Sequence, residues 1–172
     1  VCSFVDGIGP DGILDPVEYV IDPQFSGLYN VYDYHLKNVK PEHVTRRLAD
    51  LQRPWNLAVS LHAPTDELRA RLIPSRHRHT LADILAACDY YREKVNRMPT
   101  LEYTLVRQLN DAPATAEALA ALARQHHCKV NLIPCNANLP HFAAPAPAAC
   151  RTFLEILTAS GVQATLRLRK GE

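Results

Sequence analysis

The regular alternation of two kinds of segment constrains the fold of this chain most. From residue 41 onward, strand-length apolar stretches alternate with segments whose apolar residues recur at helical spacing. We expect helices at 41–50, 81–94, 113–126 and 147–160, and strands at 56–61, 100–106, 129–134 and 162–168. Thr80 and Asp111 are candidate N-caps, and Gly161 is placed to end the last helix. This order predicts an α/β fold with a mostly parallel sheet, and four strands are too few to close a barrel.

Residues 1–40 differ from the rest in composition. They are rich in Gly, Pro, Asp and Tyr, with turn signals at Gly9–Gly12 and Asp22-Pro23. We interpret them as an irregular N-terminal arm or replaced segment with one short strand near 17–21, followed by a domain at 41–172. No glycine occurs between residues 28 and 160, which excludes a P-loop or Rossmann fingerprint from the body of the chain.

Charge and cysteine usage set further bounds. A net charge of +1 gives no global argument for nucleic acid, so such a claim needs local patches. The five cysteines are scattered and odd in number, which favours free thiols in a reducing intracellular compartment. No apolar run approaches the ~20 residues of a membrane span. His126-His127-Cys128 has no second ligand pair at zinc spacing, so we expect no metal site.

Polar residues gather where two expected strands end. Ser60 and His62 are two apart at the C-terminal tip of the 56–61 strand and are expected to point to the same face, and Asn136 follows the 129–134 strand. Parallel strands would bring these ends to one edge, where ligand sites of α/β proteins lie. A Ser-His pair without a positioned acid is no catalytic triad, and a histidine at a strand end is usually a satisfied structural group, so the residues alone favour a structural role over catalysis.

Two basic clusters are candidates for RNA contact. One contains Arg69, Arg71, Arg76 and Arg78, and the other contains Arg167, Arg169 and Lys170. Such clusters can neutralise phosphates, although solvated surfaces carry the same residues.

Three segments carry a resemblance to a known family. They are Leu57–Arg69 followed by Leu72-Ile73-Pro74, Thr100–Leu105 followed by Asn110-Asp111, and Val130–Asn136. In this order they resemble the C-terminal half of the RlmN/Cfr family, radical S-adenosylmethionine (SAM) enzymes that methylate adenine in large-subunit ribosomal RNA and, for some members, transfer RNA. The resemblance runs from about residue 46 to 171. It implies a partial (β/α) barrel of the radical SAM type, whose strand tips hold a 4Fe–4S cluster and SAM. It also implies that Ser60, Leu61, His62 and Asn136 lie at the SAM site.

The chain departs from the family pattern at several points. The cluster-binding C-x-x-x-C-x-x-C and the Gly-Glu motif that grips SAM have no counterpart, and Gln108 stands where the family has glycine. The chain also ends at Glu172, before the loop that bears the family's methyl-carrying cysteine.

These departures favour one expectation and leave two alternatives. We expect a catalytically inactive domain without a cofactor, with no catalytic residue and only a vestigial SAM site. It would serve as a structural or assembly component of a ribosome, contacting ribosomal RNA and ribosomal proteins but neither DNA nor membrane. A mitochondrial location is favoured over a cytoplasmic one. The first alternative is the C-terminal part of an active radical SAM methyltransferase of 23S ribosomal RNA or transfer RNA, whose cluster-bearing half is on another chain or missing. The second is a SAM-binding regulator.

Overall fold

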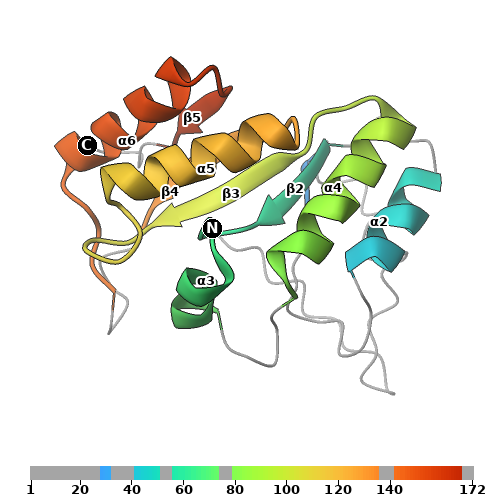
Figure 1. The fold of residues 1–172 in the computed structure, drawn as a ribbon, viewed down its shortest axis with the longest axis horizontal. Helices are drawn as coiled ribbons and strands as arrows, with labels where there is room; N and C mark the ends of the chain where they lie inside the picture. The colour runs from blue at the N-terminus through green and yellow to red at the C-terminus, as the bar shows by residue number, and fades with distance from the viewer. Residues whose placement is uncertain (1–27, 32–40, 51–55, 74–78, 136–141, 168–172) are drawn as a thin grey trace.

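A computed structural model describes residues 28–31, 41–50, 56–73, 79–135 and 142–167 of the chain. Its centre is a sheet of five parallel strands: β1 (Leu28–Val31), β2 (Asn56–Ser60), β3 (Thr100–Leu105), β4 (Lys129–Pro134) and β5 (Ala164–Leu166). Their order in the sheet is their order in the chain, and every neighbouring pair is parallel. Helices α2 (Pro41–Asp50), α3 (Asp66–Leu72), α4 (Leu81–Val95), α5 (Pro113–Gln125) and α6 (Pro147–Ala159) connect them (Figure 1).

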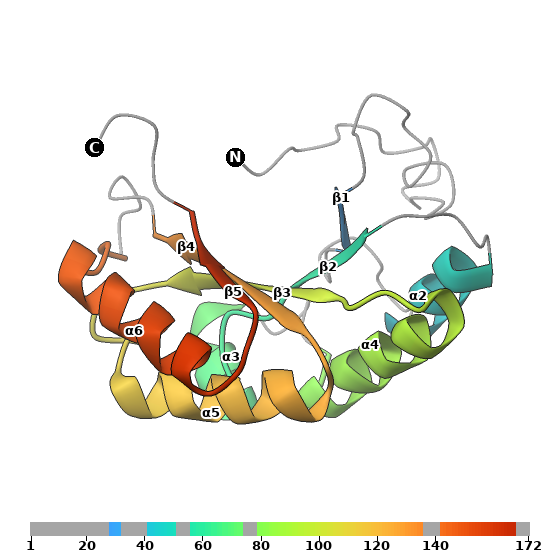
Figure 2. The same ribbon diagram turned by 90° about the horizontal axis from the view of Figure 1, so that it is seen from above.

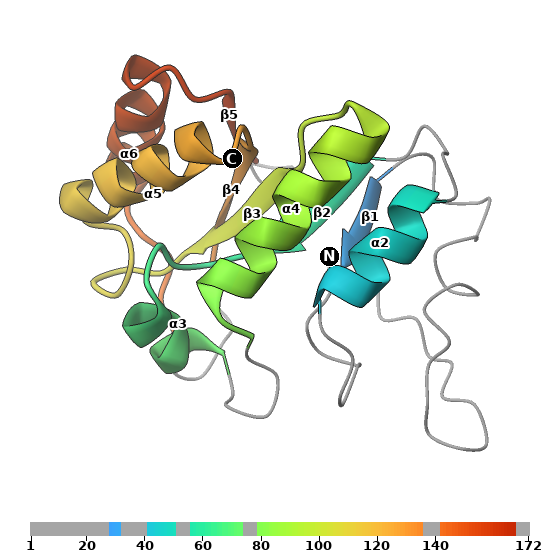
Figure 3. The ribbon, with the colours of Figure 1, turned by 45° about the vertical axis from the view of Figure 1, so that its right-hand side comes forward.

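The helices share one side of the sheet. Figure 2 shows α2, α4, α5 and α6 below the strands, and no described helix on the opposite face. Figure 3 shows α2 lying beside α4, and α5 beside α6. A sheet in sequential order with its helices on one face is a segment of a (β/α) barrel rather than a doubly wound sheet. The helix-free face corresponds to the inside of that barrel, and we call it the open face.

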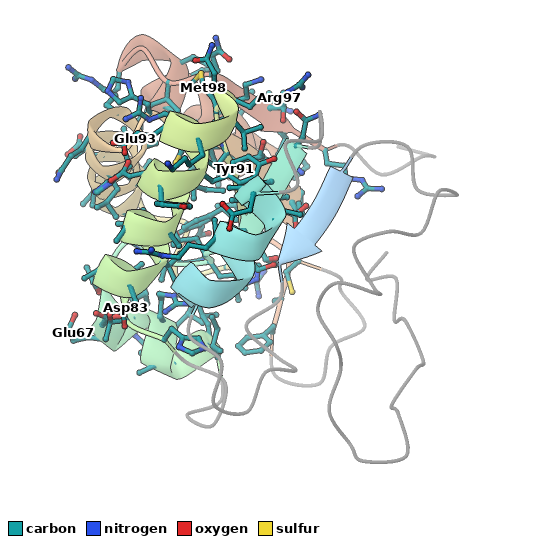
Figure 4. The ribbon with its side chains drawn as sticks, turned by 90° about the vertical axis from the view of Figure 1, so that its right-hand side faces the viewer. Glu67, Asp83, Tyr91, Glu93, Arg97 and Met98 are labelled. Atoms are coloured by element: carbon teal, nitrogen blue, oxygen red, sulfur yellow. The ribbon has the colours of Figure 1, made fainter. Side chains whose placement is uncertain are left out.

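The hydrophobic core lies between the strands and the helices. Alternate strand residues Leu101, Tyr103 and Leu105 are fully buried against it, because successive strand side chains point to opposite faces. The rings of Tyr103 and Phe153 of α6 pack with centroids 5.5 Å apart. A smaller cluster joins α2, β2 and α4 through Leu48, Ala49, Leu57 and Tyr91. In Figure 4, Tyr91 points from α4 toward the sheet and α2.

The structure confirms the expected elements with shifts of one or two residues at their ends. It also places Thr80 as the N-cap of α4, where its side chain accepts from the N–H of Asp83, and puts Gly161 at φ +80° after α6. Asp111 as N-cap was wrong: α5 is capped by Ala112, and the Asp111 carboxylate accepts from the N–H of Gln108 at 2.8 Å instead.

Two described elements were not expected. The seven-residue α3 is too short for a periodic pattern to reveal, and it begins at an N-cap, Thr65, that accepts from the N–H of Leu68. The four-residue β1 lies within the expected irregular arm and makes the sheet five-stranded rather than four-stranded. The strand expected near 17–21 lies outside the described residues. No helix in the described ranges is long and apolar enough to cross a membrane.

Candidate functional site

The candidate site starts where β2 ends. Ser60 is 7% exposed and is paired with Glu102 of β3, and the N–H of Leu61 donates to the carbonyl of Glu102 at 2.9 Å. The Leu61 side chain is part of the main core, so it supports the strand end rather than facing a ligand. His62 follows with φ +61°, a left-handed conformation that is strained for residues other than glycine. The strand therefore ends in an abrupt turn at His62.

The His62 imidazole is neutral and has a defined tautomer. Its Nδ1 lies 3.1 Å from the N–H of Thr104, which makes Nδ1 an acceptor and leaves the proton on Nε2. Burial, together with the nearby positive charge of Arg69, lowers the pKa of His62 to about 4. At neutral pH this side chain is consequently an uncharged N–H donor at the strand tip.

Asn110 holds that turn in place from the loop after β3. Its Nδ2 donates to the carbonyls of His62 at 2.9 Å and Thr104 at 2.7 Å, and its Oδ1 accepts from the N–H of Val106 at 2.7 Å. The Tyr103 hydroxyl donates to the Asn110 carbonyl at 3.1 Å. Asn110 is fully buried, so this one side chain ties the ends of β2 and β3 together. Sequence reasoning assigned it no role, although it lies in one of the resembling segments.

Arg69 corrects one of the RNA-contact predictions. Its side chain is fully buried, with Nε donating to the Leu61 carbonyl at 3.1 Å and Nη1 donating to the His79 carbonyl. Asp66 lies 3.9 Å away as a distant ion-pair partner. A guanidinium enclosed in this way cannot reach a phosphate, so the prediction of RNA contact by Arg69 was wrong. Arg69 instead stabilises the end of β2 through the Leu61 carbonyl, next to the His62 carbonyl that Asn110 binds.

A row of polar residues crosses the open face. Ser60, Glu102, Asn131 and Thr165 are paired in register across β2, β3, β4 and β5. The Thr165 hydroxyl donates to Oδ1 of Asn131 at 3.1 Å. Burial raises the pKa of Glu102, and the Arg167 charge works in the opposite direction. Hydroxyl, carboxyl and amide groups thus lie side by side across the strands, and those of Ser60 and Glu102 are buried.

The other predicted site residues divide into two groups. Arg71 at the end of α3 and Arg167 after β5 are exposed, so both remain candidates for RNA contact. Asn136, Arg76, Arg78, Arg169 and Lys170 lie outside the described residues. The predicted meeting of Asn136 with Ser60 and His62 therefore remains a prediction.

The described residues do not fit an iron–sulfur cluster. Cys88, Cys128, Cys135 and Cys150 are buried thiols, and no three His, Cys, Asp or Glu side chains of the described ranges gather as metal ligands. The hydrogen bond with Cys128, together with burial, raises the pKa of the Cys88 thiol, and burial raises that of Cys150. Metal-binding cysteines are thiolates, whereas these environments favour the thiol. We accordingly derive no chemical step through a cluster.

Solved structures define the class of this fold. A radical SAM methyltransferase from Sphaerobacter thermophilus matches 74% of this chain and 38% of its own, with a TM-score of 0.66 and 40% identity. A domain of pyruvate-formate lyase-activating enzyme from Bacteroides vulgatus matches 82% of this chain and 80% of its own, with a TM-score of 0.62. The second is only 13% identical and shows the fold alone. The fold is that of a radical SAM-type partial barrel, as predicted.

Sequence relatives narrow the class to one family. The probable dual-specificity RNA methyltransferase RlmN of Symbiobacterium thermophilum is 39% identical over 94% of this chain and 44% of its own length. The RlmN 1 protein of Myxococcus xanthus is 37% identical over 94% of this chain and 43% of its own length. No protein-family model matches the chain. The chain belongs to the RlmN-type radical SAM methyltransferases, and it spans less than half the length of these relatives.

These findings overturn the expectation of a domain without a cofactor. That expectation depended on motifs that this chain lacks. A solved relative with 40% identity is a radical SAM methyltransferase, and the curated relatives with 37–39% identity are RlmN enzymes. The family is one that works with SAM and a cluster, so the prediction of no cofactor was wrong.

Proposed function

We propose that this chain is part of an RNA methyltransferase of the RlmN type and that its strand tips contribute to the SAM site. The observation that carries the proposal is the match to RlmN proteins over 94% of the chain, which includes the His62 turn and its Asn110 brace. This is the first alternative of the sequence analysis. The relatives favour it over an inactive ribosomal component, for which nothing in the fold or the relatives speaks.

The residues of the strand tip suit the polar groups of SAM. When bound, SAM supplies the methyl group of the reaction. The Nε2–H of neutral His62 is a donor that stays uncharged, so it does not repel the sulfonium cation. Ser60 and Glu102 on the open face add a hydroxyl and a carboxyl group that can bind hydroxyl or amino groups of a ligand. Their proposed task is to bind and orient SAM.

Isothermal titration calorimetry of the chain with SAM tests this proposal. We expect saturable binding that His62→Ala weakens by about tenfold, which equals the loss of one hydrogen bond of ~1.4 kcal/mol. His126→Ala is the matched control, because His126 is a part-buried histidine that pairs with Asp89 at 2.8 Å, away from the carboxyl ends of the strands. Equal binding by the wild type and His62→Ala, or no binding by the wild type, would contradict a SAM site at this strand tip.

The substrate is proposed to be RNA, because the relatives are named RNA methyltransferases. Transfer of a labelled methyl group from SAM to RNA, measured on the whole protein that contains this segment, tests that part. Contact with ribosomal proteins and a mitochondrial location stay predictions, and fractionation of cells on sucrose gradients would test both.

A further inference from the structure

A pocket of about 450 Å³ lies at the edge of the sheet where the strands end. Three parts of the chain line it: the end of α3, the turn after β3 and the segment before α6. The lining residues are Arg71, Val106, Arg107, Gln108, Leu109, Phe142 and Ala143. None of the described SAM-site candidates Ser60, Leu61 and His62 is among its lining residues. Its volume is in the range of small-molecule pockets.

The lining combines positive charge with an aromatic face. Arg71 and Arg107 are exposed, and among the described residues no carboxylate pairs with either guanidinium. Phe142 is half-buried, and Val106 and Leu109 add apolar surface. Arginine forks fit phosphate oxygens, while an aromatic ring offers a stacking surface to any base. The part of the lining that the structure describes contains no acidic residue. The chemistry is therefore that of a phosphorylated, flat, partly apolar ligand.

Hydrogen bonds of the backbone N–H groups of Arg107 and Gln108 hold the walls of the pocket. The N–H of Arg107 donates to the carbonyl of Ala143 at 2.8 Å, which joins the turn after β3 to the segment before α6. The N–H of Gln108 donates to the Asp111 carboxylate at 2.8 Å, and Gln108 itself has φ +59°. A turn held in a strained conformation by its own hydrogen bonds is typical of binding sites. The pocket is consequently a built feature rather than a gap between loops.

We propose that this pocket binds one nucleotide of the RNA substrate, with Arg71 and Arg107 on the phosphodiester and the base stacked on Phe142. Of these residues only Arg71 was a sequence-level candidate for RNA contact. The proposal deepens the proposed function, because it assigns the RNA methyltransferase an RNA subsite. Asn110 links the two sites: it bonds the Val106 N–H at the pocket wall and the His62 carbonyl at the strand tip.

Fluorescence anisotropy with a short labelled single-stranded oligoadenylate tests the charge part. Arg71→Glu and Arg107→Glu are each expected to weaken binding about tenfold and to lower the slope of log K against log salt by about one. Arg124→Glu is the matched control, since Arg124 is exposed in the last turn of α5 and outside the pocket. It should change binding by no more than about twofold. Equal losses in all three variants would overturn the pocket as the binding site.

Two further comparisons test the stacking part. Phe142→Leu should weaken binding about tenfold, whereas Phe142→Tyr keeps an aromatic ring and should stay within about twofold. An abasic oligonucleotide of the same length should bind the wild type more weakly than oligoadenylate does. It should bind the wild type and Phe142→Leu with equal affinity, because it has no base to stack. Thermal melting of each variant separates lost binding from lost folding.

Failure of this inference and failure of the proposed function give different results. The RNA subsite is overturned, and the SAM proposal stands, if the wild type binds SAM normally but does not bind RNA. The same holds if its RNA binding is unchanged by substitution of Phe142 and of both arginines. RNA binding that follows the expected pattern without any SAM binding overturns the SAM proposal and leaves the RNA subsite standing.

Discussion

The chain reverses direction at both ends of the strands, which we call the amino-end edge and the carboxyl-end edge of the sheet. The backbone conformations that make these reversals differ between the two. At the amino-end edge, left-handed residues come directly after helices: Asn96 after α4, His127 after α5 and Gly161 after α6. This is the usual way for a helix to end. At the carboxyl-end edge, His62 and Gln108 are left-handed without following a helix. The carboxyl-end edge therefore contains strained backbone at positions where no helix end requires it.

Buried polar side chains hold that strain. Arg69 and Asn110 are both fully buried at the carboxyl-end edge, and both donate to backbone carbonyls of the His62 turn or the residue before it. At the amino-end edge the side-chain contacts are exposed or only partly buried, as in the bond from Arg97 to Asn56 at 3.1 Å and the pair of His126 with Asp89 at 2.8 Å. In Figure 4, Arg97 lies beyond the end of α4 opposite to Asp83. Strained backbone that the surrounding structure holds in place clusters at functional sites, which is consistent with the site proposed at the carboxyl-end edge.

Asn110→Ala should have the largest effect on stability. It leaves the Val106 N–H and the carbonyls of His62 and Thr104 without their partner, and we expect the free energy of unfolding to fall by about 3–4 kcal/mol. Urea denaturation followed by circular dichroism measures it. The matched control is Asn131→Ala, because Asn131 is half-buried and its side chain has Thr165 as a partner. The control should cost less than about 1 kcal/mol. Similar losses in both variants would remove the distinction between a buried brace and a surface contact.

Arg69→Met should cost slightly less, about 2–3 kcal/mol, since methionine fills much of the arginine stem's volume but leaves two carbonyls unpaired. Arg124→Met in the exposed last turn of α5 should stay within about 0.5 kcal/mol of the wild type. The same denaturation experiment compares them. A neutral Arg69→Met would mean that the strand end is held by Asn110 alone.

The pH dependence of stability tests the neutral state of His62. Its folded pKa of about 4 lies below the ordinary value of 6.5, so the unfolded chain binds a proton first as the pH falls. The stability that depends on His62 is complete above pH 6.5 and declines between pH 6.5 and 4, by about 2 kcal/mol for a half-buried group. The free energy of unfolding of the wild type should decline in this pH range, and His62→Gln should lack the part of the decline that His62 causes. The control variant His126→Gln should decline as the wild type does. Nitrogen-15 NMR of the imidazole should also show protonated Nε2 at pH 7.

The strands and helices were predictable from sequence because their patterns are local. The buried hydrogen bonds of Arg69 and Asn110 at the end of β2 were not predictable. Leu101, Tyr103 and Leu105 alternate along β3, and Thr80 and Gly161 mark helix ends by their residue types. Arg69 carries no such signal. Its charge predicted exposure, and only the tertiary fold reveals two carbonyls within its reach. Asn110 likewise bonds a residue 48 positions earlier, a contact that no periodicity encodes.

Function was less predictable than fold for a related reason. The prediction of an inactive domain without a cofactor came from motifs that this chain lacks, and the chain spans less than half the length of its RlmN relatives. The residues that are present gave the better guide. Ser60, His62 and Glu102 place polar groups at or near the carboxyl ends of neighbouring strands, which is where we propose the SAM site.

Gln108→Gly should have the smallest effect, and its sign is opposite to the others. At φ +59° glutamine carries a steric cost of about 1–2 kcal/mol that glycine avoids, while glycine costs about 0.5–1 kcal/mol more backbone entropy on folding. We expect a net gain of about 0.5–1 kcal/mol in the free energy of unfolding. Asn96→Gly at the amino-end edge, with φ +54°, should gain less, because asparagine tolerates this conformation. If Asn96→Gly stabilises the fold more than Gln108→Gly, the amino-end edge stores the greater strain and the contrast between the two edges is reversed.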